Sequence, residues 1–414
     1  MIRNIVQFLT ISAVAATAVA QIRPVPSSTG ISGRNDIFKW FTIKAVPALG
    51  GFNITEPRAI NSNHTIAGFY WEGSTCGGSA PQEHAFLTSD NGARVYAYDV
   101  PGALFTIFAG INDNNIAVGT YANDCNGTQS GMFTLDLKQT PPALTSLRLP
   151  GTAPAPFVTN PVTVTQPIAE GINNNGDVIG DFAGCKDRQS DPQCNEIHYY
   201  GFILKHDNTF TALDACTGLT RTVGGCQPGT TSTSAINDRG MVVGHYTGLD
   251  SLFKGFIYDS VSQTYMQVFC NGDLRTDTSI LGINNQGTIV GECSNEAFYA
   301  FPPYGPDAWH RFTVPLTCPT SGTQPEASAA LGISNDNQIT GIALCTGNGV
   351  EAVAFTTALN DLIGTQPNPR APSAVRGSAL SGSGDTGLGR AITRPIGGLL
   401  GPRSAGSRNL RPPQ

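Results

Sequence analysis

The sequence predicts an all-β protein: a six-bladed β-propeller of four-stranded antiparallel blades, closed by an N-terminal strand. Three observations support this prediction. The composition is that of short strands and turns, one motif occurs six times, and the last repeat lacks a strand that is in excess before the first. Four strands in a unit of about 50 residues are typical of a propeller blade. A β-solenoid is the structural alternative, but its repeats are usually shorter.

The composition favours strands over helices. Gly (48 residues) and Pro (28 residues) are abundant in the 414-residue chain, and only 13% of the residues are charged. Val, Ile, Thr, Phe and Tyr are frequent, with Asn and Gly between them, as in short strands joined by turns.

The repeated motif predicts a tight hairpin. Each copy begins with Ile, continues with Asn or Ser, has Gly, Asn or His at the fourth position after the Ile, and has Gly at the eighth. Asn or Ser opens a turn by bonding its own backbone, and Gly, Asn and His tolerate a positive φ. The glycine at the eighth position predicts the close approach of another backbone or an aromatic ring. The Ile residues that begin repeats one to six are Ile60, Ile111, Ile172, Ile236, Ile283 and Ile333.

The strand count predicts how the ring closes. A third strand follows each hairpin, as in residues 201–203, and a fourth strand often ends at Pro, as at Pro101. Repeat six has no convincing fourth strand, whereas residues 40–47 before repeat one resemble the fourth strand at residues 310–315. We therefore expect the N-terminal strand to be the outermost strand of the last blade, which would remove an exposed edge.

The motif resembles that of a known family. Residues 171–180 and 282–291 read Gly-Ile-Asn-Asn-x-Gly-x-x-x-Gly, and residues 84–86 read His-Ala-Phe. This combination resembles the extracellular HAF-repeat proteins over about residues 38–357, although only repeat one keeps the literal His-Ala-Phe. The resemblance implies a secreted repeat protein and no particular activity.

The N-terminus predicts export. Residues 1–20 have the pattern of a signal peptide, with Arg3, an apolar stretch over residues 5–19, and Ala18-Val19-Ala20 as a cleavage site. A short helix in a cytosolic protein is the alternative. The stretch is too short for a comfortable membrane span, and no other segment reaches 18 apolar residues. We expect a linker over 21–35, the propeller over 36–360, and a disordered tail rich in Pro, Gly, Ser and Arg over 361–414.

The ten cysteines predict disulfides, because they form no CxxC pair and no zinc pattern. Equivalent placement in repeats five and six suggests the pairs Cys270–Cys293 and Cys318–Cys345. Cys216–Cys226 and Cys185–Cys194 would close local loops, and Cys76–Cys125 would join neighbouring loops. If the source is eukaryotic, three sequons would accept glycans, at Asn53, Asn63 and Asn126.

The charge distribution constrains the partners. The formal net charge is −6, and the seven Arg and two Asp of residues 361–414 contribute +5, which leaves −11 on the rest. An acidic body argues against nucleic acid as the main partner. We expect a secreted monomer that binds an extracellular ligand, a carbohydrate or a protein. No cofactor or metal is expected, because most of the Asn/Asp-rich turns have one carboxylate or none, and calcium needs several.

The predicted channel holds the candidate site. The residues two positions before the repeat Ile should line it, and they are Arg58, Ala109, Glu170, Ser234, Leu281 and Leu331. Glu56 lies on the same strand face as Arg58. We therefore predict a polar cluster of Glu56, Arg58 and Glu170, which could equally be a structural ion pair or a solvated channel wall.

The sequence contains no catalytic signature, which favours a non-enzymatic binding or scaffold module. The alternative is an extracellular propeller enzyme, a glycosidase or lyase, that uses acidic residues at the channel mouth.

Overall fold

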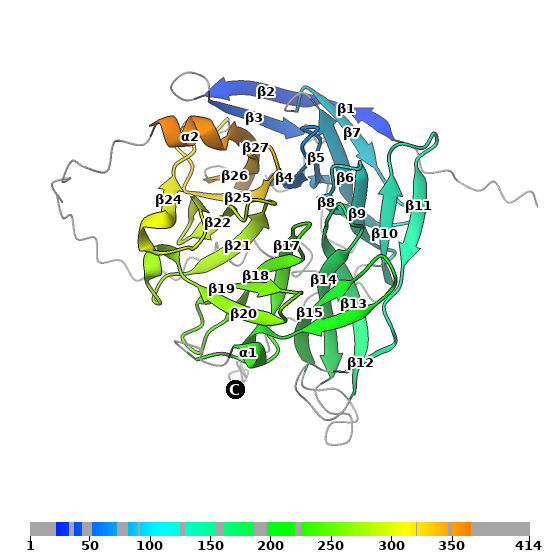
Figure 1. The fold of residues 1–414 in the computed structure, drawn as a ribbon. Helices are drawn as coiled ribbons and strands as arrows, with labels where there is room; N and C mark the ends of the chain where they lie inside the picture. The colour runs from blue at the N-terminus through cyan, green and yellow to red at the C-terminus, as the bar shows by residue number, and fades with distance from the viewer. Residues whose placement is uncertain are drawn as a thin grey trace, which may run out of the picture.

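The structure is a computed structural model, and its fold is a β-propeller built from antiparallel sheets (Figure 1). The strands of each sequence repeat form one unit, in which the first strand lies nearest the centre. The described residues are 22–32, 37–43, 52–72, 82–89, 92–124, 129–154, 161–185, 197–219, 225–319, 321–346 and 350–365.

Each of the first two repeats forms four consecutive antiparallel strands. Unit one consists of β4 (Phe52–Ile60), β5 (Ile66–Glu72), β6 (Gln82–Ser89) and β7 (Arg94–Tyr98). Unit two consists of β8 (Phe105–Ile111), β9 (Ile116–Ala122), β10 (Ser130–Asp136) and β11 (Ala143–Leu147).

The next two repeats follow the same order. Unit three consists of β13 (Pro161–Ile172), β14 (Val178–Cys185), β15 (Ile197–Leu204) and β16 (Phe210–Leu213), with the short β12 (Thr152–Pro154) beside β13. The one-turn helix α1 (Ala215–Gly218) precedes unit four, which consists of β17 (Ser232–Ile236), β18 (Met241–Thr247), β19 (Phe253–Asp259) and β20 (Thr264–Val268).

The last two repeats differ in how they are completed. Unit five consists of β21 (Thr278–Ile283), β22 (Ile289–Cys293), β23 (Glu296–Ala300) and β24 (Trp309–Phe312), with 3-10 turns at Cys270–Gly272 and Pro306–Ala308. Unit six has three consecutive strands, β25 (Ala327–Ile333), β26 (Gln338–Thr346) and β27 (Val350–Ala358), followed by helix α2 (Leu359–Thr365).

The N-terminal strand completes unit six, as the strand count predicts. Strand β3 (Phe38–Ile43) pairs antiparallel with β27, with Phe41 opposite Ala354 and Trp40 opposite Phe355. It is not the outermost strand, however, because β2 (Ser27–Ser32) pairs along its outer edge. Strand β1 (Arg23–Val25) pairs with β7 of unit one.

Two segment boundaries therefore need correction. Residues 21–35, expected to be a linker, contain β1 and β2, because their backbone groups pair with sheet edges that would otherwise be open. The segment expected to begin a disordered tail at 361 starts inside α2, which is anchored by the buried Leu359 and Leu362.

The sheets of units six, one and two are also joined by parallel pairs, whereas four-stranded antiparallel blades were predicted. Val350–Ala352 of β27 pair in parallel with Phe52–Ile54 of β4, and Glu83 of β6 pairs with Phe105 of β8. The ladder between β4 and β5 begins only at Thr55, so residues 52–54 have backbone groups available for the neighbouring unit.

The first strands of neighbouring units lie close together around the centre. The position before the repeat Ile is always Gly or Ala. A Cβ atom at Gly110 would lie 3.0 Å from the Cα of Gly171, and one at Gly332 would lie 3.1 Å from the Cα of Ala59. The contact between Gly332 and Ala59 joins the last repeat to the first.

The motif positions have the conformations expected. At the fourth position φ is positive in every repeat, at His64, Asn115, Gly176, Gly240, Gly287 and Asn337. A Cβ atom at the eighth-position glycines would lie 1.9–2.1 Å from a carbonyl oxygen of the first strand. In most repeats a Phe ring of the third strand is also close, as Phe202 is to Gly180. Both close approaches that the sequence predicts therefore occur.

The core lies between neighbouring units. One cluster joins Val118 and Met132 of unit two to Phe182 and Phe202 of unit three. Another joins Phe41 and Ile43 of β3 to Phe86 and other residues of unit one. Burial thus binds each unit to the next around the ring.

Three predicted disulfides are confirmed, Cys216–Cys226, Cys270–Cys293 and Cys318–Cys345.

Within the described ranges, no helix is long and apolar enough to cross a membrane. The sequon residue Asn63 is exposed in the turn of repeat one, where its side-chain amide donates a hydrogen bond to the backbone carbonyl of Asp113. Several predicted features lie outside the described residues: the signal peptide, the tail beyond residue 365, Cys76, Cys125, Cys194, Asn126, and the side chains of Cys185 and Asn53.

Candidate functional site

The channel-facing residues are the bulged residues of the first strands. Each first strand has a register shift two residues before the repeat Ile, as between Pro57 and Ala59 or between Ala169 and Gly171. A bulged residue has no partner in the ladder, so its side chain is re-aimed. The bulged residues are Arg58, Ala109, Glu170, Ser234, Leu281 and Leu331, and all of them line one cavity along the channel.

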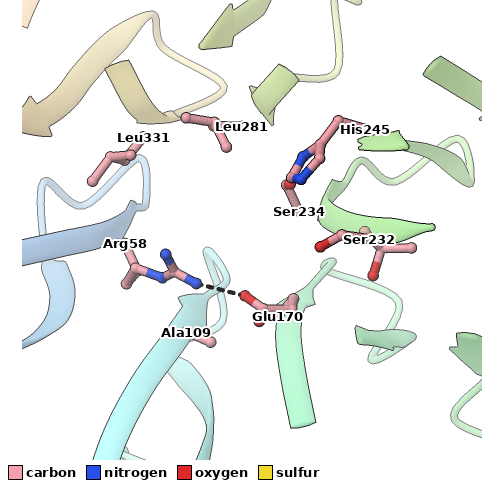
Figure 2. Close-up of a pocket in the computed structure, with 9 residues that line it drawn as sticks. Arg58, Ala109, Glu170, Ser232, Ser234, His245, Leu281 and Leu331 are labelled. Atoms are coloured by element: carbon pink, nitrogen blue, oxygen red, sulfur yellow. Dashed lines mark hydrogen bonds and ion pairs between the residues drawn. The ribbon is translucent and has the colours of Figure 1, made fainter. Parts of the chain in front are cut away.

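The structure brings together the three residues expected to form a polar cluster. Arg58 Nη1 donates to Glu56 Oε1 at 2.9 Å, and Arg58 Nη2 donates to Glu170 Oε2 at 2.7 Å. Figure 2 shows the second pair reaching across the cavity past Ala109. Arg58 belongs to unit one and Glu170 to unit three, so the small side chain of Ala109 in unit two leaves the space for this contact.

Burial perturbs the carboxyl groups of this cluster. Desolvation raises the pKa of Glu56 to about 7, although Arg58 opposes the shift. It also raises the pKa of Glu170, against the same guanidinium. A buried carboxylate is expensive even when paired, so an incompletely compensated group tends to take up a proton.

Two further buried carboxyl groups extend the cluster at either end. Glu83 of β6 is 5% exposed, and burial together with the nearby Glu56 raises its pKa to about 8. Asp181 of β14 accepts hydrogen bonds from Ser232 Oγ, Thr233 N and Thr233 Oγ1. Burial and the nearby Glu170 nevertheless raise the pKa of Asp181 to about 7. We call Glu83, Glu56, Arg58, Glu170 and Asp181 the carboxyl row.

The remaining wall of the cavity is partly polar and partly apolar. Ser232, Ser234 and His245 of unit four line it beside Glu170 (Figure 2). Leu281 and Leu331 of units five and six line the side opposite Glu170, and they pack with Ala329 and Ile342.

At the turn end of the channel, polar side chains link successive repeats. The Asn that directly follows the repeat Ile donates through Nδ2 to the backbone carbonyl of the equivalent Asn in the next repeat, as seen at Asn61, Asn112, Asn173 and Asn237. A second set of links starts two residues after the repeat Ile. In repeats one to five, the backbone N–H at this position donates to the Asp or Asn side chain at the same position of the next repeat, as Ser62 N does to Asp113 Oδ1 at 2.7 Å.

Asp113 connects turns across this end of the channel. Its Oδ2 accepts from Asn174 Nδ2 at 3.0 Å and from Asn335 Nδ2 at 2.9 Å, which joins repeats three and six. Burial opposes ionisation of Asp113, but the bonds from Ser62, Asn174 and Asn335 hold its pKa below the usual value. His64 and Asp336, 2.7 Å apart, add a link between repeats one and six.

The free space along the channel is small. The two cavities lined by the bulged residues measure about 30 and 70 Å³, whereas sites for small organic ligands are usually roughly 300–1,000 Å³. Among the described residues, no three His, Cys, Asp or Glu side chains converge as metal ligands would. The space suits a few water molecules, which need about 10–15 Å³ each by this measure.

Sequence reasoning found the three central residues but missed Glu83, Asp181 and His245. Asp181 and His245 occupy the position after the eighth-position glycine, where repeats two and five have Thr120 and Glu292. Thr120 and Asp181 accept from backbone N–H groups of the next unit's first strand, Ala169 and Thr233. Aligning this column of the repeats would have shown its polar character. Nothing in the motif indicates Glu83.

Fold and site together define a β-propeller with a narrow channel and a buried, mostly acidic cluster at its wall. Neither a protein-family model nor a curated protein matches the sequence. Solved structures with a similar fold include the phage phi92 endosialidase, at TM-score 0.42 and 8% identity, covering 86% of this chain and 72% of that one.

Two others resemble the chain at a similar level. A protein of unknown function from Dyadobacter fermentans has a TM-score of 0.39 and 11% identity, covering 81% of this chain and 99% of that one. The β-propeller domain of the Trilobed protease from Pyrococcus furiosus has a TM-score of 0.37 and 10% identity, covering 75% and 96%.

Proposed function

We propose that this protein is a secreted, non-enzymatic binding or scaffold module, and that its ring has six blades closed by the N-terminal strand. The pairing of β3 with β27 and the contact between Gly332 and Ala59 support the ring. Kinship with the HAF-repeat proteins, carried by the motif alone, is part of the same proposal. The signal-peptide pattern supports secretion, and the three disulfides are compatible with an oxidising compartment.

One observation carries the non-enzymatic function: the channel's guanidinium is consumed by internal ion pairs. Arg58 uses one Nη atom on Glu56 and the other on Glu170. Asp181 is likewise occupied by the serine and threonine of unit four. Arg58 thus joins unit one to unit three, and Asp181 joins unit three to unit four. Cavities of about 30 and 70 Å³ leave little room for a substrate. Ligand binding would then fall to the outer faces and loops, where carbohydrate or protein is the expected partner.

The perturbed carboxyl groups favour a second candidate, an extracellular glycosidase or lyase. Glu170 lines the cavity beside Asp181, and a carboxyl group whose pKa lies near 7 can act as a general acid at neutral pH. This enzyme would need the channel mouth to open enough to admit a sugar.

A paired assay separates the two functions. The protein, and a Glu170→Gln variant, would be tested in parallel on a glycan and protein binding array and on a panel of polysaccharide hydrolase and lyase substrates. We expect binding that Glu170→Gln leaves unchanged, and no turnover by either protein. Turnover by the natural sequence that Glu170→Gln abolishes would replace the binding function with the enzymatic one.

A further inference from the structure

The carboxyl row contains more acidic groups than one cation can compensate. Glu83, Glu56, Glu170 and Asp181 come from strands β6, β4, β13 and β14, and Arg58 is the guanidinium among them. Glu56 and Glu170 each form an ion pair with Arg58. Asp181 accepts three hydrogen bonds from hydroxyl and amide groups, but these groups carry no positive charge.

Arg58 is the one Lys or Arg among the described residues that line the two channel cavities. Strands β8, β17 and β25 carry no ionisable side chain. Two cations occur on other strands packed against the row, Arg94 of β7, which pairs with Ser89 at the other end of β6 from Glu83, and Lys39 of β3, which pairs with Thr356 of β27. The further ionisable side chains on these strands include Tyr70 of β5, His84 of β6, Tyr121 of β9, Asp136 of β10, His198, Tyr199 and Tyr200 of β15, His245 and Tyr246 of β18, and Glu351 of β27. Of these, His245 lines the cavity with Arg58 and Glu170.

Glu83 is the least compensated member of the row. Glu83 is 5% exposed, and burial, Glu56 and Arg58 determine the pKa of its carboxyl group without a contribution from a hydrogen bond. It lies where β6 meets β8, between units one and two, and its electrostatic neighbours are Glu56 and Arg58. Two carboxylates near one guanidinium already engaged by Glu170 cannot both remain charged at low cost.

We propose that the carboxyl row is a pH-sensitive latch between the first three units of the ring, closed when Glu83 and its neighbours carry protons and loosened when they ionise. Protonation leaves a row whose net charge is close to zero, so that β4, β6 and β13 can pack around it. Ionisation adds negative charges at fixed, buried positions, and the resulting repulsion pushes these strands apart. The latch therefore favours a closed channel in acidic surroundings and a looser one above neutral pH.

The sign of the effect follows from the direction of the shifts. The pKa is raised to about 7 for Glu56 and Asp181 and to about 8 for Glu83. The native state therefore binds protons that the unfolded chain releases near pH 4. The stabilisation is complete below the unfolded pKa values, declines as pH rises through the native ones, and is lost above about pH 8.

The test compares two Glu→Gln variants of the protein. Glu83→Gln replaces the buried carboxyl group by a neutral one, and Glu296→Gln does the same at an exposed site, 42% exposed and 2.9 Å from Arg311. Melting temperatures are measured between pH 5 and pH 9. For the natural sequence we expect a fall of roughly 5 °C or more over this range. Glu83→Gln should flatten this dependence, and Glu296→Gln should leave it unchanged.

Two further readouts keep the proposal falsifiable if Glu83→Gln fails to fold. Infrared difference spectra of the natural protein between pH 6 and pH 9 should show loss of the carbonyl stretch of protonated carboxyl groups. Hydrogen exchange of the backbone amides of β4, β6 and β13 should become faster over the same range, after correction for intrinsic exchange. A pH dependence that is the same in both variants, or a spectrum without protonated carboxyl groups at pH 6, would overturn the latch.

Discussion

Arg58 of the first repeat and Glu170 of the third form a 2.7 Å ion pair across the channel, past the small side chain of Ala109 in the repeat between them. The two residues are 112 positions apart in the sequence. The pair exists because both occupy bulges in the first strands, and because the intervening repeat has alanine at that position. Several properties of the protein follow from arrangements of this kind between repeats.

Removing the guanidinium should destabilise the protein in a pH-dependent way. Arg58→Gln leaves Glu56 and Glu170 buried without a cation, which should cost about 3 kcal/mol at pH 8, because breaking a buried pair strands its partner. At pH 5 the carboxyl groups can take up protons, so most of the loss should disappear. Thermal unfolding at both pH values measures this.

The matched control for this variant is Arg23→Gln. Arg23 forms an exposed pair with Asp99 at 3.4 Å, and such pairs contribute about 0–1 kcal/mol. Two outcomes would contradict a structural role for the Arg58–Glu170 pair. Arg58→Gln could destabilise the protein no more than Arg23→Gln does, or it could destabilise the protein equally at pH 5 and pH 8.

The eighth-position glycines should not tolerate alanine. A Cβ atom at Gly180 would lie 1.9 Å from the Ile168 carbonyl oxygen and 2.7 Å from the Phe202 ring. Relieving this overlap requires separation of β13 from β14, so Gly180→Ala should cost about 3 kcal/mol or more. At Gly151 a Cβ atom would meet nothing within 4 Å. Gly151→Ala should therefore change the free energy of unfolding, measured by chemical denaturation, by less than about 0.5 kcal/mol. Equal stability of the two variants would show that the strands can move apart freely.

The Asn residues of the turns should contribute more than local turn formation. Asn112 accepts from Ile116 N through Oδ1 and donates through Nδ2 to the Asn173 carbonyl, both at 2.9 Å, and it is buried. Asn112→Ala should therefore cost about 2–3 kcal/mol, because it leaves buried backbone groups unpaired. Asn114 makes one exposed bond, to the Asn174 carbonyl at 3.1 Å. Asn114→Ala should lower the free energy of unfolding much less. The measurement is urea unfolding, and the same midpoint for both variants would argue against a stabilising role for the buried Asn112 bonds.

The N-terminal strands should be required for closure. Phe41 of β3 is fully buried, and its ring packs edge-on against Phe86 of unit one at 5.9 Å. Deleting residues 22–43 removes this contact and exposes the edges of β27 and β7, which β3 and β1 cover. We expect a large fall in melting temperature and association into oligomers, because open strand edges pair with one another.

The comparison for this deletion is a chain that ends after residue 365, which keeps α2 and every described strand. It should melt like the full protein and keep its hydrodynamic size. The variant that lacks residues 22–43 could instead be as stable and as monodisperse as this truncated chain. That result would mean that contacts between the first strands of the units close the ring without β1, β2 and β3.

The sequence by itself determined the units of this protein and the local chemistry of each. Asn or Ser followed by Gly, Asn or His specified the turns, because few residues accept a positive φ there. The eighth-position glycine specified where backbone and ring approach. The surplus strand before repeat one indicated closure, and equivalent placement indicated Cys270–Cys293 and Cys318–Cys345. These features depend on neighbours along the chain or on equivalence between repeats, so a periodic sequence contains them.

Only the tertiary structure decided what happens between repeats. The sequence predicted that Arg58 and Glu170 share a cluster, but their direct ion pair past Ala109 depends on the bulges of the first strands. That Glu83 lies near Glu56 depends on the contact between β6 and β8. Strands β1 and β2 carry no motif, because they add to existing sheet edges mainly through backbone hydrogen bonds. The pKa values of the carboxyl row likewise arise from burial among several units. The repeat period related Arg58 to Glu170 and so predicted their cluster, but no periodicity relates Glu83 or Asp181 to it, which is why the structure alone added them to the charged interior.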